Sequence, residues 1–335
     1  ADTEGVAMAR ILSRRDLELV LKIDEVIDVV DQAFAHLDRG QAAVPVRTAV
    51  EVGEHDGLLL VMPGYLSEMG ALGVKMVTVY PNNPARYAMP NVLGILVLID
   101  CKTGEPVCVM DAAYLTAIRT GAVCAVATRY LARQDARSLG MVGTGAQAGG
   151  IATAICRVRG IHSIKAYSLE PQDRRARFAR EVEEKTGVPV TLVRSAEEAV
   201  RGSDIVALAT SSPSPVISGS WLAPGTHVNA IGNHHPDSRE VDSDTVKKSI
   251  VVCDDIATCM QEAGDIILPI KNGEIPPHHV RYSLPEVVAG RGPARGADDI
   301  TLFKSVGLSI QDVSTALYAY RKAVASGIGV EVDLT

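Results

Sequence analysis

The sequence predicts an α/β protein of two domains: a Rossmann-type doubly wound parallel sheet and, before it, an N-terminal α+β domain. Three observations predict this fold. The chain has 335 residues, which is more than one hydrophobic core usually spans. Residues 138–253 alternate short apolar strands with helices, as in a doubly wound parallel sheet. Residues 44–99 carry successive strand-like runs without that alternation, which indicates a separate domain.

The composition is that of an ordinary globular protein and excludes several functional classes. Apolar residues make up 47% and charged residues 22% of the chain, and the net charge of −7 argues against nucleic acid or an acidic membrane as partner. No apolar run approaches the roughly 20 residues of a membrane span, and the first ten residues lack the apolar core of a signal peptide. The six cysteines form no CxxC pair and no zinc spacing. We therefore expect a cytoplasmic protein with reduced thiols and no metal site.

The N-terminal part begins with helices and continues with strands. The pattern predicts a helix that begins at residues 16–20 and an amphipathic helix over 24–37 that ends before Gly40. The expected strands are 44–52, 58–62, 72–80 and 94–99, and a long helix rich in Ala and Thr follows at 111–131. We place this domain at residues 1–120. We expect the last helix, over 309–326, to return to it, so that residues 311–335 belong to it as well.

The second domain is expected at residues 121–310. Its predicted strands are 139–142, 164–169, 190–193, 205–210, 227–231 and 250–253. Helices are expected between the glycine turn at 143–147 and Arg159, over 172–185, and in a short segment after Ser195, where Glu198 completes the pattern of a capping box.

A glycine-rich loop follows the first strand of this domain and begins a helix. It reads Gly143-Thr144-Gly145-Ala146-Gln147-Ala148, which is G-x-G-x-x-A in the strand–turn–helix context that dinucleotide binding requires. The first glycine permits the tight turn, the second lets a pyrophosphate approach the backbone, and small Ala148 lets helix and strand pack closely. The helix N-terminus then attracts the anion. The alternative is a glycine turn in a Rossmann-like domain that has lost its ligand.

The second strand ends near a residue that distinguishes NAD from NADP. Glu170 follows Gly143 by 27 residues, about where an acidic side chain accepts a hydrogen bond from the ribose 2′-hydroxyl. Ser168, Arg174 and Arg175 lie close in sequence and could instead bind a 2′-phosphate. We expect NAD(H), with NADP(H) as the alternative. Glu170 could also be no more than a solvated loop carboxylate.

Several motifs, in order and over nearly the whole chain, resemble the ornithine cyclodeaminase/mu-crystallin family. They are Met62-Pro63, Gly73-Val74-Lys75, Thr116-Ala117-Ile118-Arg119-Thr120-Gly121-Ala122, the loop from Gly143 to Ala148, Val228-Asn229-Ala230-Ile231-Gly232, Glu262-Ala263-Gly264-Asp265 and Thr301-Leu302-Phe303-Lys304-Ser305-Val306-Gly307. The resemblance implies a Rossmann domain together with an N-terminal domain that forms a homodimer through its sheet. It also implies that Thr210, Ile231, Gly232, Val306 and Gly307 join Gly143, Thr144, Gly145, Ala146, Gln147 and Glu170 in binding the cofactor.

Three basic residues match the substrate site of that family. Arg47 is expected in a strand, where by itself it would be read as a solvated side chain. Lys75 shares a strand face with Gly73 and Val77, and burial on such a face lowers a lysine pKa and suits it to proton transfer. Arg119 lies within an Ala/Thr-rich helix, where a buried guanidinium needs an anionic partner. That partner is a substrate carboxylate, held in a bidentate clamp, or an internal carboxylate.

One position departs from the cyclodeaminase members of the family. They carry an aspartate shortly after the Asn-Ala-x-Gly strand, where this chain has His234. Asp237 could replace that aspartate only with a shift of three residues. A histidine moves protons near neutral pH, so His234 is a candidate catalytic residue beside Lys75. It could equally be a loop residue without chemistry.

These residues favour a cytoplasmic NAD(P)-dependent oxidoreductase that transfers a hydride between nicotinamide and the α-carbon of a small imino or amino acid. The substrate would be a ketimine, pyrroline-2-carboxylate or the imine of an alanine dehydrogenase. The first alternative is an ornithine or lysine cyclodeaminase, an ammonia lyase with bound NAD, and the second is a non-catalytic ligand-binding protein of crystallin type. A site with Arg47, Lys75 and Arg119 is electropositive and should disfavour a dicationic ornithine.

Overall fold

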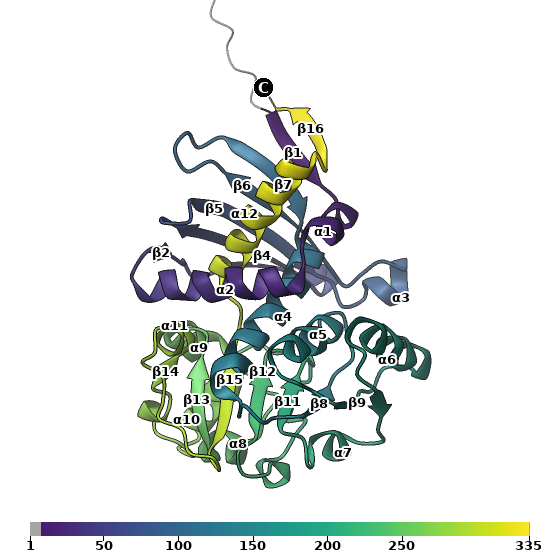
Figure 1. The fold of residues 1–335 in the computed structure, drawn as a ribbon, viewed down its shortest axis with the longest axis vertical. Helices are drawn as coiled ribbons and strands as arrows, with labels where there is room; N and C mark the ends of the chain where they lie inside the picture. Colours follow the sequence, from purple (N-terminus) through teal and green to yellow (C-terminus); the bar gives the residue numbers. More distant parts are fainter. Residues whose placement is uncertain (1–7, 335) are drawn as a thin grey trace, which may run out of the picture. The chain divides into compact units, whose positions relative to one another are not determined.

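The computed structural model describes residues 8–334, and the chain divides into two compact units (Figure 1). Unit 1 contains the described residues up to Arg119 and those from Leu308 onward, and unit 2 contains Thr120–Gly307. The sequence predicted the corresponding division at residues 121 and 310. None of the helices within residues 8–334 combines the length and the apolar character of a membrane span.

Unit 1 is a mixed sheet with helices. Its strands are β1 (Met8–Leu12), β2 (Ala42–Ala43), β3 (Thr48–Val52), β4 (Gly57–Leu66), β5 (Ala71–Val79), β6 (Val92–Ile99), β7 (Pro106–Asp111) and β16 (Val330–Asp333). Its helices are α1 (Arg14–Val20), α2 (Ile23–Asp38), α3 (Asn83–Tyr87), the first part of α4 (Ala112–Leu131) and α12 (Ser309–Ser326), with a 3-10 turn, η1, at Gly53–His55. The strand order is β16-β1-β7-β6-β5-β4-β2, with β3 also paired to β4.

Helix α12 packs against β4, β5 and α2, and this packing positions the buried polar residues of unit 1. Strands β4 to β7 are consecutive antiparallel neighbours. In β5 the alternate residues Gly73, Lys75 and Val77 are buried, as the two-residue period of a strand requires. The predicted face of Lys75 is therefore confirmed.

The strand predicted over residues 44–52 is wrong in its first half. Strand β3 begins at Thr48, and residues 44–47 are not in a strand. Pro45 has no backbone N–H to donate, so the segment cannot continue a ladder there. Arg47 consequently lies before the strand, half-buried, and has no strand face to share with Ala49 and Glu51.

Unit 2 is a parallel sheet covered by helices. Its strands are β8 (Ser138–Val142), β9 (Ser163–Tyr167), β10 (Val190–Leu192), β11 (Ile205–Leu208), β12 (His227–Ala230), β13 (Ser249–Cys253), β14 (Tyr282–Ser283) and β15 (Ile300–Lys304). Its helices are the rest of α4, α5 (Ala148–Val158), α6 (Gln172–Thr186), α7 (Ala196–Val200), α8 (Ser243–Lys248), α9 (Ile256–Glu262), α10 (Gly264–Lys271) and α11 (Leu284–Val288), with 3-10 turns η2 (Gly219–Trp221) and η3 (Pro277–His279).

All strand pairs of unit 2 are parallel, in the order β10-β9-β8-β11-β12-β15-β13-β14. The predicted doubly wound sheet is thus confirmed. The order reverses between β8 and β11, and in such sheets ligands bind at the carboxyl ends of the strands beside this reversal. Strand β15 lies between β12 and β13, and the sequence pattern predicts no strand there, only a family motif.

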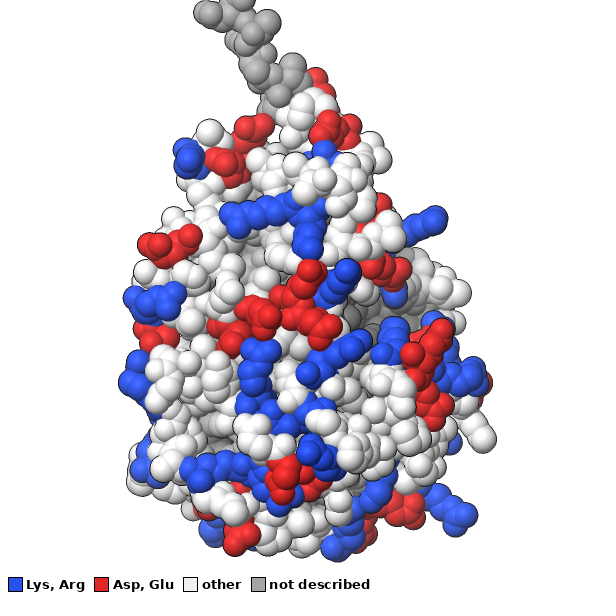
Figure 2. Space-filling model, in the orientation of Figure 1, with Lys and Arg blue, Asp and Glu red and all other residues white. Residues whose placement is uncertain are grey.

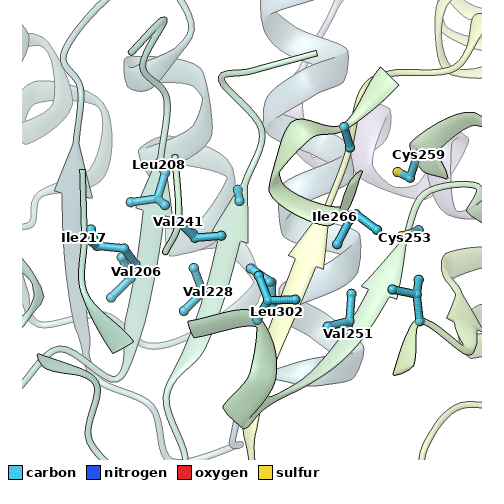
Figure 3. Close-up of a cluster of buried hydrophobic side chains, with 14 of the residues drawn as sticks. Val206, Leu208, Ile217, Val228, Val241, Val251, Cys253, Cys259, Ile266 and Leu302 are labelled. Atoms are coloured by element: carbon cyan, nitrogen blue, oxygen red, sulfur yellow. The ribbon is translucent and has the colours of Figure 1, made fainter. Parts of the chain in front are cut away.

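The sheet of unit 2 is apolar on its buried faces, as a parallel sheet between helices must be. Val206, Val228, Leu302 and Val251 come from four neighbouring strands and pack into one cluster with Ile266 of α10 (Figure 3). The capping box predicted for α7 is half formed. Ser195 accepts from the Glu198 amide, but the Glu198 carboxylate accepts from the amide of Arg194.

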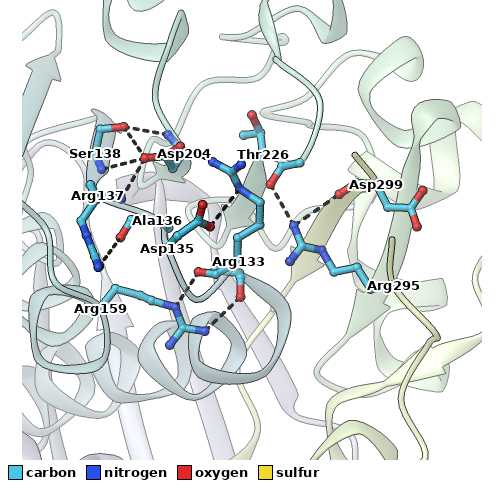
Figure 4. Close-up of polar contacts among 12 residues, drawn as sticks. Arg133, Asp135, Ala136, Arg137, Ser138, Arg159, Asp204, Thr226, Arg295 and Asp299 are labelled. Carbon is cyan, nitrogen blue, oxygen red and sulfur yellow. Dashed lines mark hydrogen bonds and ion pairs between the residues drawn. The ribbon is translucent and has the colours of Figure 1, made fainter. Parts of the chain in front are cut away.

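Arginine and aspartate side chains gather near the amino-terminal ends of the strands in this sheet (Figure 4). Arg159 is buried and donates to the carbonyls of Arg129, Ala132 and Arg133 at the end of α4, and to Val158. These carbonyls follow the last turn of a helix and have no intrahelical partner. Arg159 is therefore the C-terminal cap of α4.

Acidic and basic side chains are interspersed on the face drawn in Figure 2. This distribution accords with the net charge of −7, which disfavours a polyanionic partner. All six cysteines carry free thiols, as the sequence predicts.

The role of Arg159 gives a prediction about stability. Arg159→Met keeps the length of the side chain but removes every donor to the buried carbonyls, so we expect the free energy of unfolding to fall by about 3 kcal/mol. Urea denaturation measures this change. Arg157→Met, at an exposed position in α5 two residues before Arg159, is the control and should change stability by less than about 0.5 kcal/mol. Equal stabilities for both variants would contradict the capping role.

Candidate functional site

A buried carboxylate of α12 joins two of the predicted substrate-site residues in unit 1. Asp312 is fully buried; its Oδ2 lies 2.8 Å from Lys75 Nζ, and its Oδ1 accepts from Arg119 Nε at 2.9 Å. Arg119 also donates from Nη1 to Gln311 Oε1 at 2.7 Å. The structure thus brings together Lys75 from β5 and Arg119 from α4, which are 44 residues apart in sequence.

Lys75 is 1% exposed, and its surroundings lower its pKa to about 8. Burial is the largest cause, because it disfavours the charged ammonium. The positive charges of Arg119 and Arg47 lower the pKa further, whereas Asp312 raises it. Both of the other predicted basic residues, Arg119 and Arg47, therefore act on Lys75. A lysine in this range exchanges protons near neutral pH.

The cluster carries more positive than negative charge. Lys75 and Arg119 are two cations, and both contact the single carboxylate of Asp312. Arg119 therefore has the internal carboxylate that was one of its two predicted partners. Because one carboxylate does not neutralise two cations, the cluster still favours an added anion.

Further polar groups of the same two helices are buried without a hydrogen-bond partner within residues 8–334. They are Thr116 Oγ1 on α4, and Ser309 Oγ and Gln311 Nε2 on α12. A buried polar atom without a partner is costly, and such atoms are often completed by a ligand or water. The cluster therefore has donors to offer besides its charged groups.

No sequence motif singles out Asp312. An acidic residue in the first turn of a helix is ordinary, since it favours the positive end of the helix dipole. The signal that could have found it is its apolar neighbourhood, because residues 309–317 are all buried and Asp312 lies in their middle.

In unit 2 the glycine loop has the conformation that a dinucleotide requires. Gly143 has φ +100°, and a Cβ there would lie 2.4 Å from the carbonyl oxygen of Ala209. A Cβ at Gly145 would meet no atom within 4 Å, so nothing inside the protein demands glycine there. The absence of a side chain instead leaves the backbone open to an external group. Ala148 is fully buried, as the motif predicts.

Helix α5 begins at this loop and has no side-chain cap on its N-terminus. The amide of Ala148 donates to the carbonyl of Gly145. The N-terminus of the helix nevertheless carries the positive end of the helix dipole, which favours an anion. Thr144 Oγ1 lies 2.6 Å from Ser168 Oγ, which ties the loop to the end of β9. Glu170, at that same end, forms an ion pair with Arg174 at 3.2 Å on the surface. The uncapped helix N-terminus and the open backbone at Gly145 fit a dinucleotide.

The remaining predicted cofactor residues lie at the ends of the central strands. The amides of Thr210 and Gly232 both donate to the buried carboxylate of Glu240. The amides of Val306 and Gly307 both donate to the buried carboxylate of Asp254. Ile231, half-buried, packs against the core of the sheet. Sequence reasoning missed both carboxylates, because neither lies in a recognisable motif.

The loop that carries His234 is held on both sides. Asn233 donates from Nδ2 to Ser212 O at 2.9 Å, its carbonyl accepts from Lys304 Nζ at 2.6 Å, and its Oδ1 accepts from the amide of His235. His234 itself is half-buried, whereas Asp237 is exposed in the turn that follows. Of these two candidate residues, His234 is therefore the less exposed.

Comparison with known proteins places the chain in a family. Its sequence matches a protein-family model over residues 8–327. The chain belongs to the ornithine cyclodeaminase/mu-crystallin family. The resemblance that its motifs indicated is thus confirmed. The Δ1-pyrroline-2-carboxylate reductase of Bacillus cereus is 35% identical over 325 residues, which are 96% of this chain and 99% of that protein.

Solved structures of family members have the same fold. The Δ1-pyrroline-2-carboxylate reductase of Thermococcus litoralis, in complex with NADH and L-proline, is 44% identical with a TM-score of 0.93, over 96% of this chain and 100% of that one. An archaeal alanine dehydrogenase dimer with bound NAD is 34% identical with a TM-score of 0.91, over 98% and 100% of the two chains. These two proteins therefore share the α/β architecture of this chain over almost their whole length.

The contact between Asp312 and Lys75 gives a prediction about titration. Asp312→Asn keeps the shape of the side chain but removes the negative charge that raises the Lys75 pKa, so that pKa should fall below about 8. NMR of protein with labelled lysine side chains measures it. Glu68→Gln, at an exposed position in the turn after β4, is the control and should leave it unchanged. A Lys75 pKa that stays at about 8 in Asp312→Asn would refute the coupling.

The open space at Gly145 gives a prediction about the cofactor. Gly145→Val should fold with the stability of the parent, because its Cβ meets nothing inside the protein. Its affinity for NADH should fall at least about tenfold, since the side chain occupies the path of the pyrophosphate. Fluorescence titration with NADH measures the affinity. Undiminished binding by the folded variant would exclude the assigned loop.

Proposed function

We propose that this chain is an NAD(H)-dependent reductase of small imino acids, and that its preferred substrate is the cyclic imine Δ1-pyrroline-2-carboxylate, which it reduces to proline. The observation that carries the proposal is Lys75, which is buried with a pKa of about 8 and contacts the carboxylate that it shares with Arg119, Asp312. Two relatives that match almost the whole chain, at 35% and 44% identity, are reductases of this substrate.

The substrate carboxylate would bind to the cationic cluster of unit 1. Arg119 and Arg47 supply positive charge, and Gln311 Nε2 is a buried donor without a partner in the described part of the chain. A guanidinium held by Asp312 and Gln311 is fixed in orientation, and a fixed donor loses less entropy when a carboxylate binds.

Lys75 would hold the proton that the imine nitrogen receives on reduction. Its ammonium is kept in place by Asp312, and burial together with Arg119 and Arg47 makes it a stronger acid. At neutral pH most molecules carry the protonated form, which is the acid that reduction needs. His234 is a second group that could hold a proton near neutral pH.

NAD(H) would bind along the carboxyl edge of the sheet in unit 2. Gly143, Thr144, Gly145, Ala146 and Gln147 would hold the pyrophosphate, Glu170 the ribose, and the strand ends at Thr210, Ile231, Gly232, Val306 and Gly307 the remainder. When bound, the nicotinamide supplies or accepts the hydride, and the protein supplies placement and charge. The acidic Glu170 and the NADH and NAD in the two similar structures favour NAD(H) over NADP(H).

We further propose that the protein is a cytoplasmic homodimer. Val46, Val50 and Ile95 are large apolar side chains that lie exposed in or beside the strands of unit 1, and exposed apolar surface of this kind marks an interface. The similar alanine dehydrogenase is a dimer. Six free thiols favour a reducing compartment.

The experiment that tests the function compares three substrates. With NADH and pyrroline-2-carboxylate we expect NADH consumption and stoichiometric proline, and with pyruvate plus ammonia a slower reaction. With ornithine and catalytic NAD we expect no ammonia, because the electropositive cluster disfavours a second cationic amine. Ammonia release without net change in NADH would show a lyase. Ligand binding without either reaction would show a binding protein.

The Lys75 pKa gives a prediction about pH dependence. Imine reduction needs the Lys75 side chain in its protonated form, so the kcat/KM of reduction should fall as the pH rises through about 8. Proline oxidation needs the Lys75 side chain in its neutral form, so the kcat/KM of oxidation should rise through the same pH. Lys75→Arg, which stays charged at every accessible pH, should lose both transitions. Identical pH profiles for the two directions would contradict the role of Lys75.

A further inference from the structure

A buried glutamate links the ends of two central strands in unit 2. Glu240 is fully buried, and its Oε1 accepts from the amide of Thr210 at 2.7 Å and from the Thr210 hydroxyl at 2.8 Å. Its Oε2 accepts from the amide of Gly232 at 2.7 Å. One carboxylate thus holds Thr210 and Gly232, each the second residue after its strand, β11 or β12.

The backbone of Glu240 is itself held by further hydrogen bonds. Its amide donates to Asp265 Oδ1 at 2.7 Å, and its carbonyl accepts from the amide of Val216 at 2.8 Å. Lys304 Nζ lies 2.7 Å from Asp265 Oδ2 and donates to the carbonyl of Asn233. The backbone that leads from Gly232 to His234 is consequently held by two buried side chains.

The position of Thr210 is tied to the glycine loop. A Cβ on Gly143 would lie 2.4 Å from the carbonyl oxygen of Ala209 and 3.1 Å from Thr210 Cγ2. The loop and the end of β11 are therefore packed without spare room. A change in the hydrogen bonds between Thr210 and Glu240 must therefore displace the glycine loop, because close-packed interiors transmit small displacements.

We infer that Glu240 is a positioning residue, whose carboxylate fixes the ends of β11 and β12 in the arrangement that binds NAD(H) and releases them when it takes up a proton. The inference rests on the proposed function for its ligand. Glu240 contacts the strand ends and acts on the cofactor only through them.

The charges around Glu240 place this change near neutral pH. Burial raises its pKa to about 7. From β15 the ammonium of Lys304 lowers it, and from α10 the carboxylate of Asp265 raises it. The ends of β11 and β12 contribute amides and the Thr210 hydroxyl, which favour the charged form. All three donors need the carboxylate as acceptor, so the hold weakens as the pH falls through about 7.

A simple charge effect predicts the opposite behaviour. NADH is anionic, so the loss of a nearby negative charge would by itself strengthen its binding. The positioning role instead predicts weaker binding when Glu240 is neutral. The direction of the pH dependence therefore separates the two explanations.

The test is the affinity for NADH, without substrate, from pH 5.5 to 8.5 in the parent and in Glu240→Gln. For the parent we expect weaker binding as the pH falls through about 7. For Glu240→Gln we expect affinity at least about tenfold weaker at pH 8.5 and independent of pH, because an amide turns an NH2 group toward a backbone N–H. Glu286→Gln, which removes the carboxylate that caps α11, is the matched control and should follow the parent.

Glu240→Asp keeps the negative charge but shortens the side chain by one methylene group. It tests the positioning role if Glu240→Gln does not fold. It should bind NADH more weakly than the parent and keep a pH dependence. Parent-like affinity and pH profile in the Gln variant, or parent-like affinity in the Asp variant, would overturn the inference while leaving the proposed function intact. Failure of the parent to bind NADH at any pH would overturn both.

Discussion

The ion pair that organises unit 1 is the contact of Asp312 with both Lys75 and Arg119. Each of these three side chains is at least nine-tenths buried, and a buried charge without a partner is strongly destabilising. The pairing therefore requires α12, β5 and α4 to stay in register. It explains why the last helix of the chain returns to the first sheet, since Asp312 and Gln311 are carried by α12 and their partners by elements near the other end of the sequence.

The same arrangement gives the cluster its chemistry. Asp312 stabilises the two cations Lys75 and Arg119 but neutralises only one unit of charge. The remaining positive charge attracts a carboxylate, and its repulsion together with burial keeps the Lys75 pKa near 8. Unit 2 uses buried carboxylates differently. Glu240 and Asp254 accept from backbone amides at the strand ends, so they shape the surface on which a cofactor would lie.

What the sequence could predict is what local patterns encode. The alternation around Lys75 indicated its buried face, and the glycine loop was recognisable because strand, turn and helix accompany it. The partners of Asp312, Glu240 and Lys304 were not predictable. Asp312 contacts Lys75, Glu240 contacts Thr210 and Lys304 contacts Asp265 across 237, 30 and 39 residues, and no local period records such contacts. The strand assigned to Arg47 failed for a local reason, since Pro45 interrupts the ladder.

The most direct test of this account is whether a carboxylate ligand changes the protonation of Lys75. Pyrrole-2-carboxylate, a planar analogue that cannot be reduced in place of the imine, can be titrated at pH 8 in the presence of NADH, by calorimetry in buffers of different ionisation enthalpy. A negative charge placed beside Lys75 raises its pKa, so binding should take up a sizeable fraction of a proton, and Lys75→Met should abolish the uptake. Binding with no proton uptake by the parent protein would contradict the claim that this cluster is the carboxylate site.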